Sequence, residues 1–231
     1  MSIRLDKALV HMGVCTRSET KKLIRQKKIR VNGETALKAE QKIEEGSVID
    51  VDGFACVYQD LVYLMLNKPD GVISATEGNE ETVIDLIDMP VKDLFPIGRL
   101  DKDTTGLLLL SNDGPLAHML LSPAHHVEKE YEVTLKKPVR EKDIERIASG
   151  IRDGEDTFLP AKYIPQDETH GNIILSEGKY HEIKRMFEQC HNEVIGLKRI
   201  RMKNLVLDES LAPGEYRPLT EEEITELKRP L

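Results

Sequence analysis

The sequence predicts an α+β fold divided between a small amino-terminal module and a larger second domain. Two amphipathic helix patterns followed by short strand patterns fill residues 1–58. From residue 61 onward, apolar strand patterns occur among helix patterns. The charge is divided as well, because residues 1–43 carry 11 Lys and Arg against 4 Asp and Glu, whereas residues 44–231 carry 22 against 37. This asymmetry predicts a basic binding module joined to an acidic body.

The composition excludes several classes of protein. A chain of 231 residues is long enough for two separate cores. It contains no apolar run of 18 residues, and its first residues lack the apolar stretch of a signal peptide, so we expect a cytoplasmic protein without a membrane segment. The three cysteines Cys15, Cys56 and Cys190 are odd in number and have no paired spacing. Neither a disulfide framework nor a zinc site is predicted.

The amino-terminal module begins with two predicted helices. Apolar residues recur at i, i+3, i+4 and i+7 from Leu5 to Met12, and Gly13 ends this pattern. Thr16 and Glu19 have the spacing of a capping box that starts the second helix. A helix rich in cations can present them to a phosphate backbone. The candidate RNA-contacting cations of the module are Arg4, Arg17, Lys21, Lys22, Arg25 and Lys28.

Short strands complete the module. Asn32-Gly33 lies between apolar runs and is a strong signal for a tight hairpin. A further strand is predicted at 47–51, and residues 54 to about 60 interrupt the pattern. We therefore place the domain boundary there, which gives domains at 1–58 and 61–231.

The first half of the second domain contains two apolar strand patterns. The run at 61–69 predicts a central strand that stops at Pro69. A short helix is predicted at 82–87, and four leucines at 107–110 predict a buried strand. Asp113 has the position of a helix cap, and the helix that it starts ends before Pro123.

The second half begins with an alternating strand pattern. Apolar and polar residues alternate at 129–135, so Tyr131, Val133 and Leu135 are expected on one buried face. Thr220 and Glu223 form a capping box for the last helix. The other predicted elements are helices at 140–149 and within 181–190, and strands at 158–164, 172–176 and 194–207.

Residues 98–110 form a polar turn followed by the leucine strand. Asp101 lies in this turn between Gly98 and Gly106, so its carboxylate is expected at the rim of a core, where a fixed and partly shielded acid suits catalysis. Two alternatives remain open from the residues alone. The aspartate can serve the geometry of the turn, or Asp101 and Asp103 can bind a hard metal ion.

The string at 99–107, Arg-Leu-Asp-Lys-Asp-Thr-Thr-Gly-Leu, closely resembles the catalytic motif of the pseudouridine synthases. That motif reads Arg-Leu-Asp, two residues, Thr, a small residue, Gly and Leu. Residues 68–71 and 177–187 and the tail at 211–224 resemble the branch that acts on small-subunit (16S) ribosomal RNA. The helices and strands of the amino-terminal module resemble an S4 RNA-binding domain. Together these resemblances cover essentially the full chain.

The resemblance implies a catalytic domain with a mixed, mostly antiparallel central sheet flanked by helices. It implies isomerisation of uridine to pseudouridine, which gains and loses no atoms and requires no redox cofactor. Asp101 is the nucleophile in this interpretation, and a nearby cation keeps it ionised. By resemblance that cation is Lys184. Its neighbour Arg185 is the alternative candidate and is otherwise expected to bind the substrate. The sequence also lacks dinucleotide-type and phosphate-binding glycine loops.

The resemblance assigns three further residues to the substrate. Tyr131 matches the tyrosine that stacks on the target uracil, and Ile183 matches an apolar residue that lines the same pocket. Arg99 matches an arginine that contacts RNA beside the everted nucleotide. From the pattern alone, Tyr131 and Ile183 are equally core residues, and Arg99 is equally a cation of the turn.

We therefore expect a monomeric enzyme that modifies 16S rRNA, of the position-516 type, either in the RNA itself or in a small-subunit assembly intermediate. No metal or cofactor is expected. Three alternatives remain, namely the same reaction on 23S rRNA, a non-catalytic ribosome-assembly protein, and a metal-dependent hydrolase. A thiol nucleophile at Cys190 is disfavoured because the sequence indicates no third catalytic group.

Overall fold

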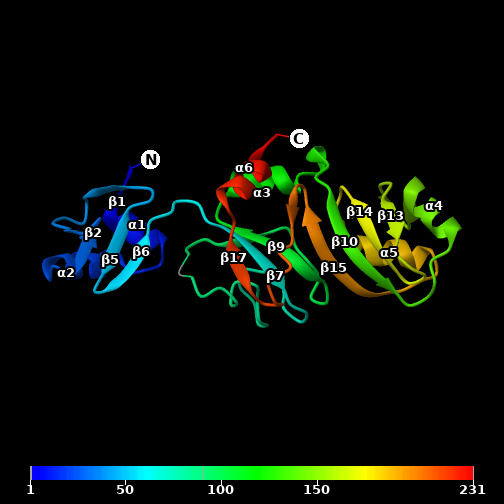
Figure 1. Cartoon of the computed structure of the whole chain (residues 1–231), viewed down its shortest axis with the longest axis horizontal. Coiled ribbons are helices and arrows are strands. Elements are labelled where there is room, and N and C mark those ends of the chain that lie inside the picture. The colour runs from blue at the N-terminus through cyan, green and yellow to red at the C-terminus, as the bar shows by residue number, and fades with distance from the viewer. Residues whose placement is uncertain (1, 90, 231) are drawn as a thin grey trace. The chain divides into compact units, whose positions relative to one another are not determined.

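The computed structural model describes residues 2–89 and 91–230. Contacts divide the described residues into two compact units (Figure 1). The first unit contains residues 2–62, 88–89 and 91–94, and the second contains residues 63–87 and 95–230. Both units combine helices with sheets, which confirms the predicted α+β class.

The first unit packs two helices on small antiparallel sheets. Asn32 and Gly33 turn the chain between β2 and β3, as the sequence predicts. The predicted capping box of α2 is also confirmed, because the Glu19 backbone N–H donates to Thr16 Oγ1 at 3.3 Å and the Thr16 backbone N–H donates to Glu19 Oε2 at 2.8 Å. The elements are β1 (Ser2–Arg4), α1 (Leu5–His11), α2 (Arg17–Arg25), β2 (Ile29–Val31), β3 (Glu34–Thr35), β4 (Lys42–Glu44), β5 (Val48–Val51) and β6 (Phe54–Val57).

The second unit is built around a nine-stranded sheet with the order β13-β14-β10-β15-β9-β7-β17, to which β8 and β16 add at β9 and β15. Among the described residues, β9 and β15 pair in parallel and the other strand pairs of this sheet are antiparallel, which confirms a mixed and mostly antiparallel sheet. Its strands are β7 (Tyr63–Lys68), β8 (Phe95–Ile97), β9 (Thr105–Ser111), β10 (Lys129–Leu135), β13 (Lys162–Pro165), β14 (His170–Leu175), β15 (Val194–Met202), β16 (Leu205–Val206) and β17 (Tyr216–Pro218).

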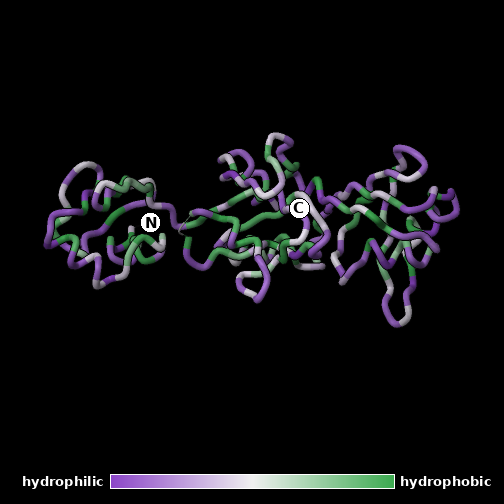
Figure 2. The backbone as a smooth tube through the Cα atoms, turned by 90° about the horizontal axis from the view of Figure 1, so that it is seen from below, coloured by the Kyte–Doolittle hydropathy of each residue, from purple (hydrophilic) through white to green (hydrophobic). Residues whose placement is uncertain are grey.

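Four helices and a ribbon complete the second unit. The predicted cap of α3 is confirmed, because Asp113 Oδ1 accepts from the Leu116 N–H at 3.0 Å. Hydrophobic residues are concentrated along the extended segments, whereas the connecting loops are mostly hydrophilic (Figure 2). The remaining elements are α3 (Gly114–Leu121), a 3-10 turn (Pro123–His125), α4 (Glu141–Ser149), β11 (Ile151–Asp153), β12 (Asp156–Phe158), α5 (Glu182–Gln189) and α6 (Glu221–Lys228).

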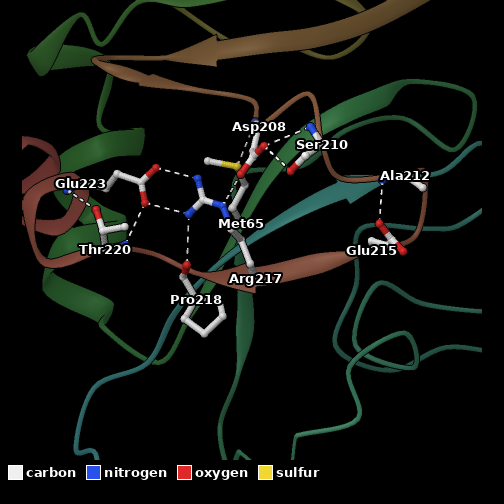
Figure 3. A network of polar contacts seen from close by, with 9 residues as sticks. All are labelled: Met65, Asp208, Ser210, Ala212, Glu215, Arg217, Pro218, Thr220 and Glu223. Atoms are coloured by element: carbon white, nitrogen blue, oxygen red, sulfur yellow. Dashed lines mark hydrogen bonds and ion pairs between the residues drawn. The ribbon is translucent and has the colours of Figure 1, made fainter.

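Arg217 fastens the edge strand β17 to its surroundings (Figure 3). Its Nε donates to Asp208 Oδ2 at 2.6 Å, and its two Nη atoms donate to the Glu223 carboxylate at 2.8 Å. Glu223 also belongs to the predicted capping box of α6, which is confirmed. One arginine thus ties together β17, the loop after β16 and the last helix, with the bidentate geometry that gives such pairs their strength.

The helix predicted at 82–87 is wrong. These residues form consecutive turns, in which the Asp85 N–H donates to the Thr82 carbonyl and the Ile87 N–H donates to the Ile84 carbonyl, both at 3.1 Å. The Asp85 carboxylate accepts from the Thr82 N–H at 2.8 Å and from its hydroxyl at 2.9 Å. Short polar side chains that bond to the local backbone compete with helix formation, and here that competition gives turns.

Gly106 sits where β9 meets β15. Thr105 and Gly106 pair in parallel with Lys198 and Arg199, and Gly106 has a φ of +94°. A Cβ atom at Gly106 would lie 2.3 Å from the Arg199 carbonyl oxygen, closer than such atoms approach. The close contact of the two strands therefore requires glycine at this position.

We expect Gly106→Ala to lower the free energy of unfolding by about 3 kcal/mol or more, because strain and a backbone clash act together. Gly154→Ala is the matched control, since Gly154 also has a positive φ, +62°, but its Cβ would meet no atom within 4 Å. That control should lose only about 1 kcal/mol. Urea unfolding of both variants measures the difference, and equal losses would contradict the assigned clash.

Burial of Glu182 makes the stability of the second unit depend on pH. The side chain is 4% exposed, and burial raises its pKa above the usual 4.5, with the neighbouring Glu177 adding to the rise. Between pH 4.5 and the raised value, the folded state holds a proton that the unfolded chain has lost. The free energy of unfolding therefore falls as the pH rises through this window.

We expect Glu182→Gln to remove this fall, so that the wild type loses more stability than the variant between pH 5 and pH 8. Urea unfolding at several pH values tests this. Glu188→Gln, which changes an exposed glutamate of the same helix, should keep the wild-type dependence. If the free energy of unfolding had the same pH dependence in the wild type and in Glu182→Gln, this interpretation would be wrong.

Candidate active site

Asp101 lies in the turn between β8 and β9, and the backbone of this turn is held from several sides. The Thr104 N–H donates to the Asp101 carbonyl at 3.1 Å. Ser74 Oγ donates to the Leu100 carbonyl at 2.9 Å and accepts from the Leu100 N–H at 3.1 Å. The backbone of Leu100, just before Asp101, and the carbonyl of Asp101 itself are therefore both hydrogen-bonded. The carboxylate thus projects from a fixed backbone.

Lys68 donates hydrogen bonds to the backbone of the same turn. Its side chain is fully buried, and Nζ donates to the carbonyls of Pro69 at 3.0 Å, Lys102 at 3.1 Å and Thr104 at 2.9 Å. All three donors of the ammonium are therefore used by backbone oxygens. Burial lowers the pKa of Lys68 to about 8, although Asp70, Asp103 and Asp101 oppose this.

The side chain of Lys184 in α5 reaches the turn. Its Nζ donates to Asp101 Oδ2 at 3.0 Å and to Asp103 Oδ1 at 2.6 Å. Burial alone would lower the pKa of Lys184, but these hydrogen bonds outweigh it and the pKa lies above its usual value. The hydrogen bond from Lys184 likewise lowers the pKa of Asp103. Lys184 thus supplies the cation expected beside Asp101.

The Asp101 side chain, which is 29% exposed, faces a small cavity of about 70 Å³. Tyr131 of β10 and Ile183 of α5 contribute to its walls and are almost completely buried. Arg99 lies exposed at its edge. The full set of lining residues is Arg99, Leu100, Asp101, Thr104, Tyr131, Leu175, Gly178, Lys179, His181, Glu182, Ile183, Lys184 and Leu197. An acid, its cation, an aromatic ring and apolar side chains therefore share one concave site.

Arg185 does not line this cavity. Its Nε donates to Asp153 Oδ2 and its Nη2 to Asp156 Oδ2, both at 2.7 Å, and its guanidinium lies over the Phe158 ring at 4.8 Å. These contacts fasten the ribbon β11–β12 to α5. Of the two adjacent cations in α5, only Lys184 is directed to Asp101.

Two residues of the site were not singled out by the sequence. His181 Nε2 lies 3.5 Å from Asp101 Oδ1, and the ring stacks on exposed Tyr180 with 3.8 Å between centroids. His181 has a φ of +50°, a conformation rare outside glycine. Thr104 lines the cavity with a buried hydroxyl that has no hydrogen-bond partner among the described residues. The segment around His181 entered the sequence analysis only as part of a family motif.

The candidate RNA-contacting cations of the first unit fall into two groups. Arg17, Lys21, Lys22 and Arg25 lie exposed on α2. The other two are occupied by acids, since Arg4 bonds Asp6 and Glu40, and Lys28 bonds Asp52. Of the six candidates, the four on helix α2 therefore have no acidic partner among the described residues.

Within residues 2–89 and 91–230, no three or more His, Cys, Asp or Glu side chains are grouped so that they could hold a metal ion. Over the same residues, no helix combines the length and the apolar character that a membrane crossing requires.

Two protein-family models match the sequence, that of RNA pseudouridylate synthase over residues 62–189 and that of the S4 domain over residues 3–49. Ribosomal small subunit pseudouridine synthase A of Haemophilus influenzae is 42% identical over 97% of this chain and 99% of its own length. The Escherichia coli protein of the same name is 40% identical over 96% and 98%. An uncharacterised RNA pseudouridine synthase of Bacillus subtilis is 42% identical over 99% of both chains.

A crystal structure of a pseudouridylate synthase matches the fold with a TM-score of 0.70 and 41% sequence identity. The match covers 97% of this chain and 99% of that one. The family model spans the turn of Asp101 and the helix of Lys184, and the relatives align over nearly their whole length. The chain therefore belongs to the RNA pseudouridylate synthase family and carries an S4 domain at its amino-terminal side.

Proposed function

We propose that this protein converts one uridine of 16S ribosomal RNA to pseudouridine, with Asp101 as nucleophile and without a cofactor. The observation that carries the proposal is the carboxylate of Asp101, bonded to Lys184 and facing a cavity walled by Tyr131 and Ile183. Relatives at about 40% identity bear the name ribosomal small subunit pseudouridine synthase A, which supports the choice of substrate.

The reaction breaks the bond between N1 of uracil and C1′ of the ribose, turns the base and joins C5 to C1′. The proton on C5 leaves at the end, and N1 gains one, so the atoms balance. Positive charge develops at C1′ as the first bond breaks, and a carboxylate stabilises or traps such charge in sugar chemistry. Three routes use Asp101 in this reaction. The carboxylate adds to C1′, adds to the pyrimidine ring, or removes a ribose proton to give a glycal.

Lys184 stabilises the negative charge of Asp101 from within the protein. At 3.0 Å, an ammonium offsets part of the desolvation that a carboxylate suffers in a cavity. Lys184 also bonds Asp103, which lies largely exposed, so of the two carboxylates bonded to Lys184 only Asp101 lines the cavity. The cation therefore helps to hold the nucleophile in position.

A uridine in folded RNA must leave its stack to reach Asp101, at a cost of a few kcal/mol. In this proposal the uracil stacks on Tyr131 beside Ile183, and Arg99 at the edge of the cavity contacts the RNA strand. The cations of the S4-like domain, proposed at 1–58, add affinity that offsets the cost. The catalytic domain is proposed at 61–231, acting in the cytoplasm as a monomer.

We expect Asp101→Asn to lower turnover by several orders of magnitude while RNA binding persists, because only the nucleophile is lost. Tritium release from 16S rRNA labelled at C5 of uridine measures turnover. Asp103→Asn is a matched control, since it removes the other carboxylate bonded to Lys184, and it should lose less than about tenfold. Wild-type turnover in Asp101→Asn would exclude Asp101 as the nucleophile. The alternative of a metal-dependent hydrolase predicts that a chelator abolishes the activity.

Mapping of pseudouridine identifies the substrate. We expect purified protein to modify one uridine of a 16S rRNA transcript, at position 516, and to leave a 23S transcript unmodified. A deletion strain should lack the same modification. Pseudouridine in 23S rRNA alone would favour the second candidate substrate, and RNA binding without pseudouridine in either transcript would indicate an assembly protein without catalysis.

A further inference from the structure

A larger cavity, of about 450 Å³, adjoins the pocket of Asp101. The two share Arg99, Tyr131, Gly178 and Lys179 as wall residues. The larger cavity is additionally lined by Lys129 of β10 and Arg199 of β15, which contribute nothing to the pocket of Asp101. Neither of these two cations has a role in the chemistry described above.

Strand register brings the two cations to one face of the sheet. Tyr131 lies opposite Arg199 in the β10–β15 pair, and Lys129 is two residues before Tyr131 on β10. Because side chains alternate along a strand, Lys129, Tyr131 and Arg199 point to the same side. The face that carries the proposed stacking ring therefore also carries two basic groups.

Arg199 is only 2% exposed. Its Nε donates to the Leu107 carbonyl at 2.7 Å. Its Nη2 is buried and has no hydrogen-bond partner among the described residues. A buried guanidinium donor normally finds an acceptor, so this nitrogen could donate a hydrogen bond to a ligand in the cavity.

Lys129 is 7% exposed, and its Nζ donates to the carbonyls of Val127 at 2.9 Å and Glu177 at 3.4 Å. Burial and, to a smaller extent, the charge of Arg199 lower the pKa of Lys129 to about 8, while the charge of Glu182 opposes this. Over the described residues, neither Lys129 nor Arg199 forms an ion pair with a carboxylate. Two neighbouring buried cations thus line a cavity without a direct ion pair to either of them.

Uncompensated buried charge is costly, and two like charges together cost more than one. The cavity wall offers them little relief, since Glu177 already lies 3.4 Å from Lys179 Nζ and accepts the Leu159 N–H at 2.6 Å. An anion in the cavity would pair with both cations and would accept from Arg199 Nη2. Arginine binds phosphate with matched geometry, and lysine adds a point charge.

We propose that this cavity binds a backbone phosphate of the RNA strand next to the target uridine, held by Arg199 and Lys129. The inference rests on the proposed function, because Tyr131 forms a wall common to both cavities and a base stacked there would carry its own strand into the larger one. A phosphate fixed at this point sets which nucleotide enters the pocket of Asp101. Phosphate contacts commonly set register in this way.

The slope of the logarithm of the association constant against the logarithm of salt concentration tests the proposal, with a 16S rRNA transcript as the probe. We expect Lys129→Gln to reduce the magnitude of this slope by about 0.7 to 1, the loss of one phosphate contact. Lys129→Arg keeps the charge and should keep the wild-type slope. Lys142→Gln removes an exposed lysine from α4 that does not line the cavity, and should leave the slope unchanged.

Three results would overturn the proposal. The first is an unchanged slope in Lys129→Gln, and the second is a decrease of the slope in Lys142→Gln equal to that in Lys129→Gln. The third is a decrease of the slope in Lys129→Arg as large as in Lys129→Gln, with the fold of both variants intact by circular dichroism. Titration with inorganic phosphate distinguishes the source of the anion. If it shifts the Lys129 side-chain NMR signals while Lys129→Gln leaves the RNA slope unchanged, the cavity is a free-phosphate site and the proposed RNA contact is wrong.

These measurements report binding and require no turnover. If the wild-type protein binds the transcript with the expected difference between Lys129→Gln and Lys142→Gln but forms no pseudouridine, the proposed function fails and the phosphate contact stands. If pseudouridine forms and the difference is absent, the function stands and the phosphate contact fails.

Discussion

The contact between the Lys184 ammonium and the Asp101 carboxylate is the interaction around which the site is organised. The two residues are 83 positions apart. Asp101 lies in the turn before β9 with its side chain 29% exposed, and Lys184 lies in α5 with its side chain 19% exposed. Partial exposure keeps the cost of desolvation moderate, while the cavity keeps the field of the cation stronger than in open water. A reactive acid that was either fully buried or fully solvated would lack one of these advantages.

Much of the surrounding structure serves to hold the two ends of that contact in place. Lys68 and Ser74 bond the backbone of the Asp101 turn, and Gly106 lets β9 approach β15 closely. Arg185 fastens α5 to the ribbon β11–β12 and so supports the helix that carries Lys184. The Asp101–Lys184 pair therefore rests on side chains whose own hydrogen bonds are satisfied by backbone or acids, which favours a fixed geometry.

The distribution of charge resolves the apparent conflict between an acidic chain and an RNA substrate. The net charge is −8, yet exposed cations line α2 and buried cations line the cavity beside Tyr131. Binding to RNA depends on local positive surface, and acidic residues elsewhere reduce attachment to wrong sites. In our proposals, the S4 domain contributes affinity for the RNA, and the cavity beside Tyr131 determines which nucleotide enters the pocket of Asp101.

Local signals in the sequence determined the elements whose causes are local. The capping box of α2, the Asn32-Gly33 hairpin, the Asp113 cap and the buried face of β10 depend on residues within a few positions of one another, and all are confirmed. The helix at 82–87 failed for a related reason, because Asp85 bonds to Thr82 in competition with the helical backbone. The sequence also identified the Asp101 turn, by a motif that is continuous in the chain.

Tertiary structure alone decided which distant groups meet. Lys184 and Arg185 are adjacent in sequence, but successive side chains on a helix point in directions about 100° apart, so one reaches Asp101 and the other reaches Asp153. The meeting of Lys129 and Arg199 depends on the register between β10 and β15, which are separated by more than 50 residues. Periodicity within a segment carries no information on such pairings, because they are fixed by the packing of whole strands and helices.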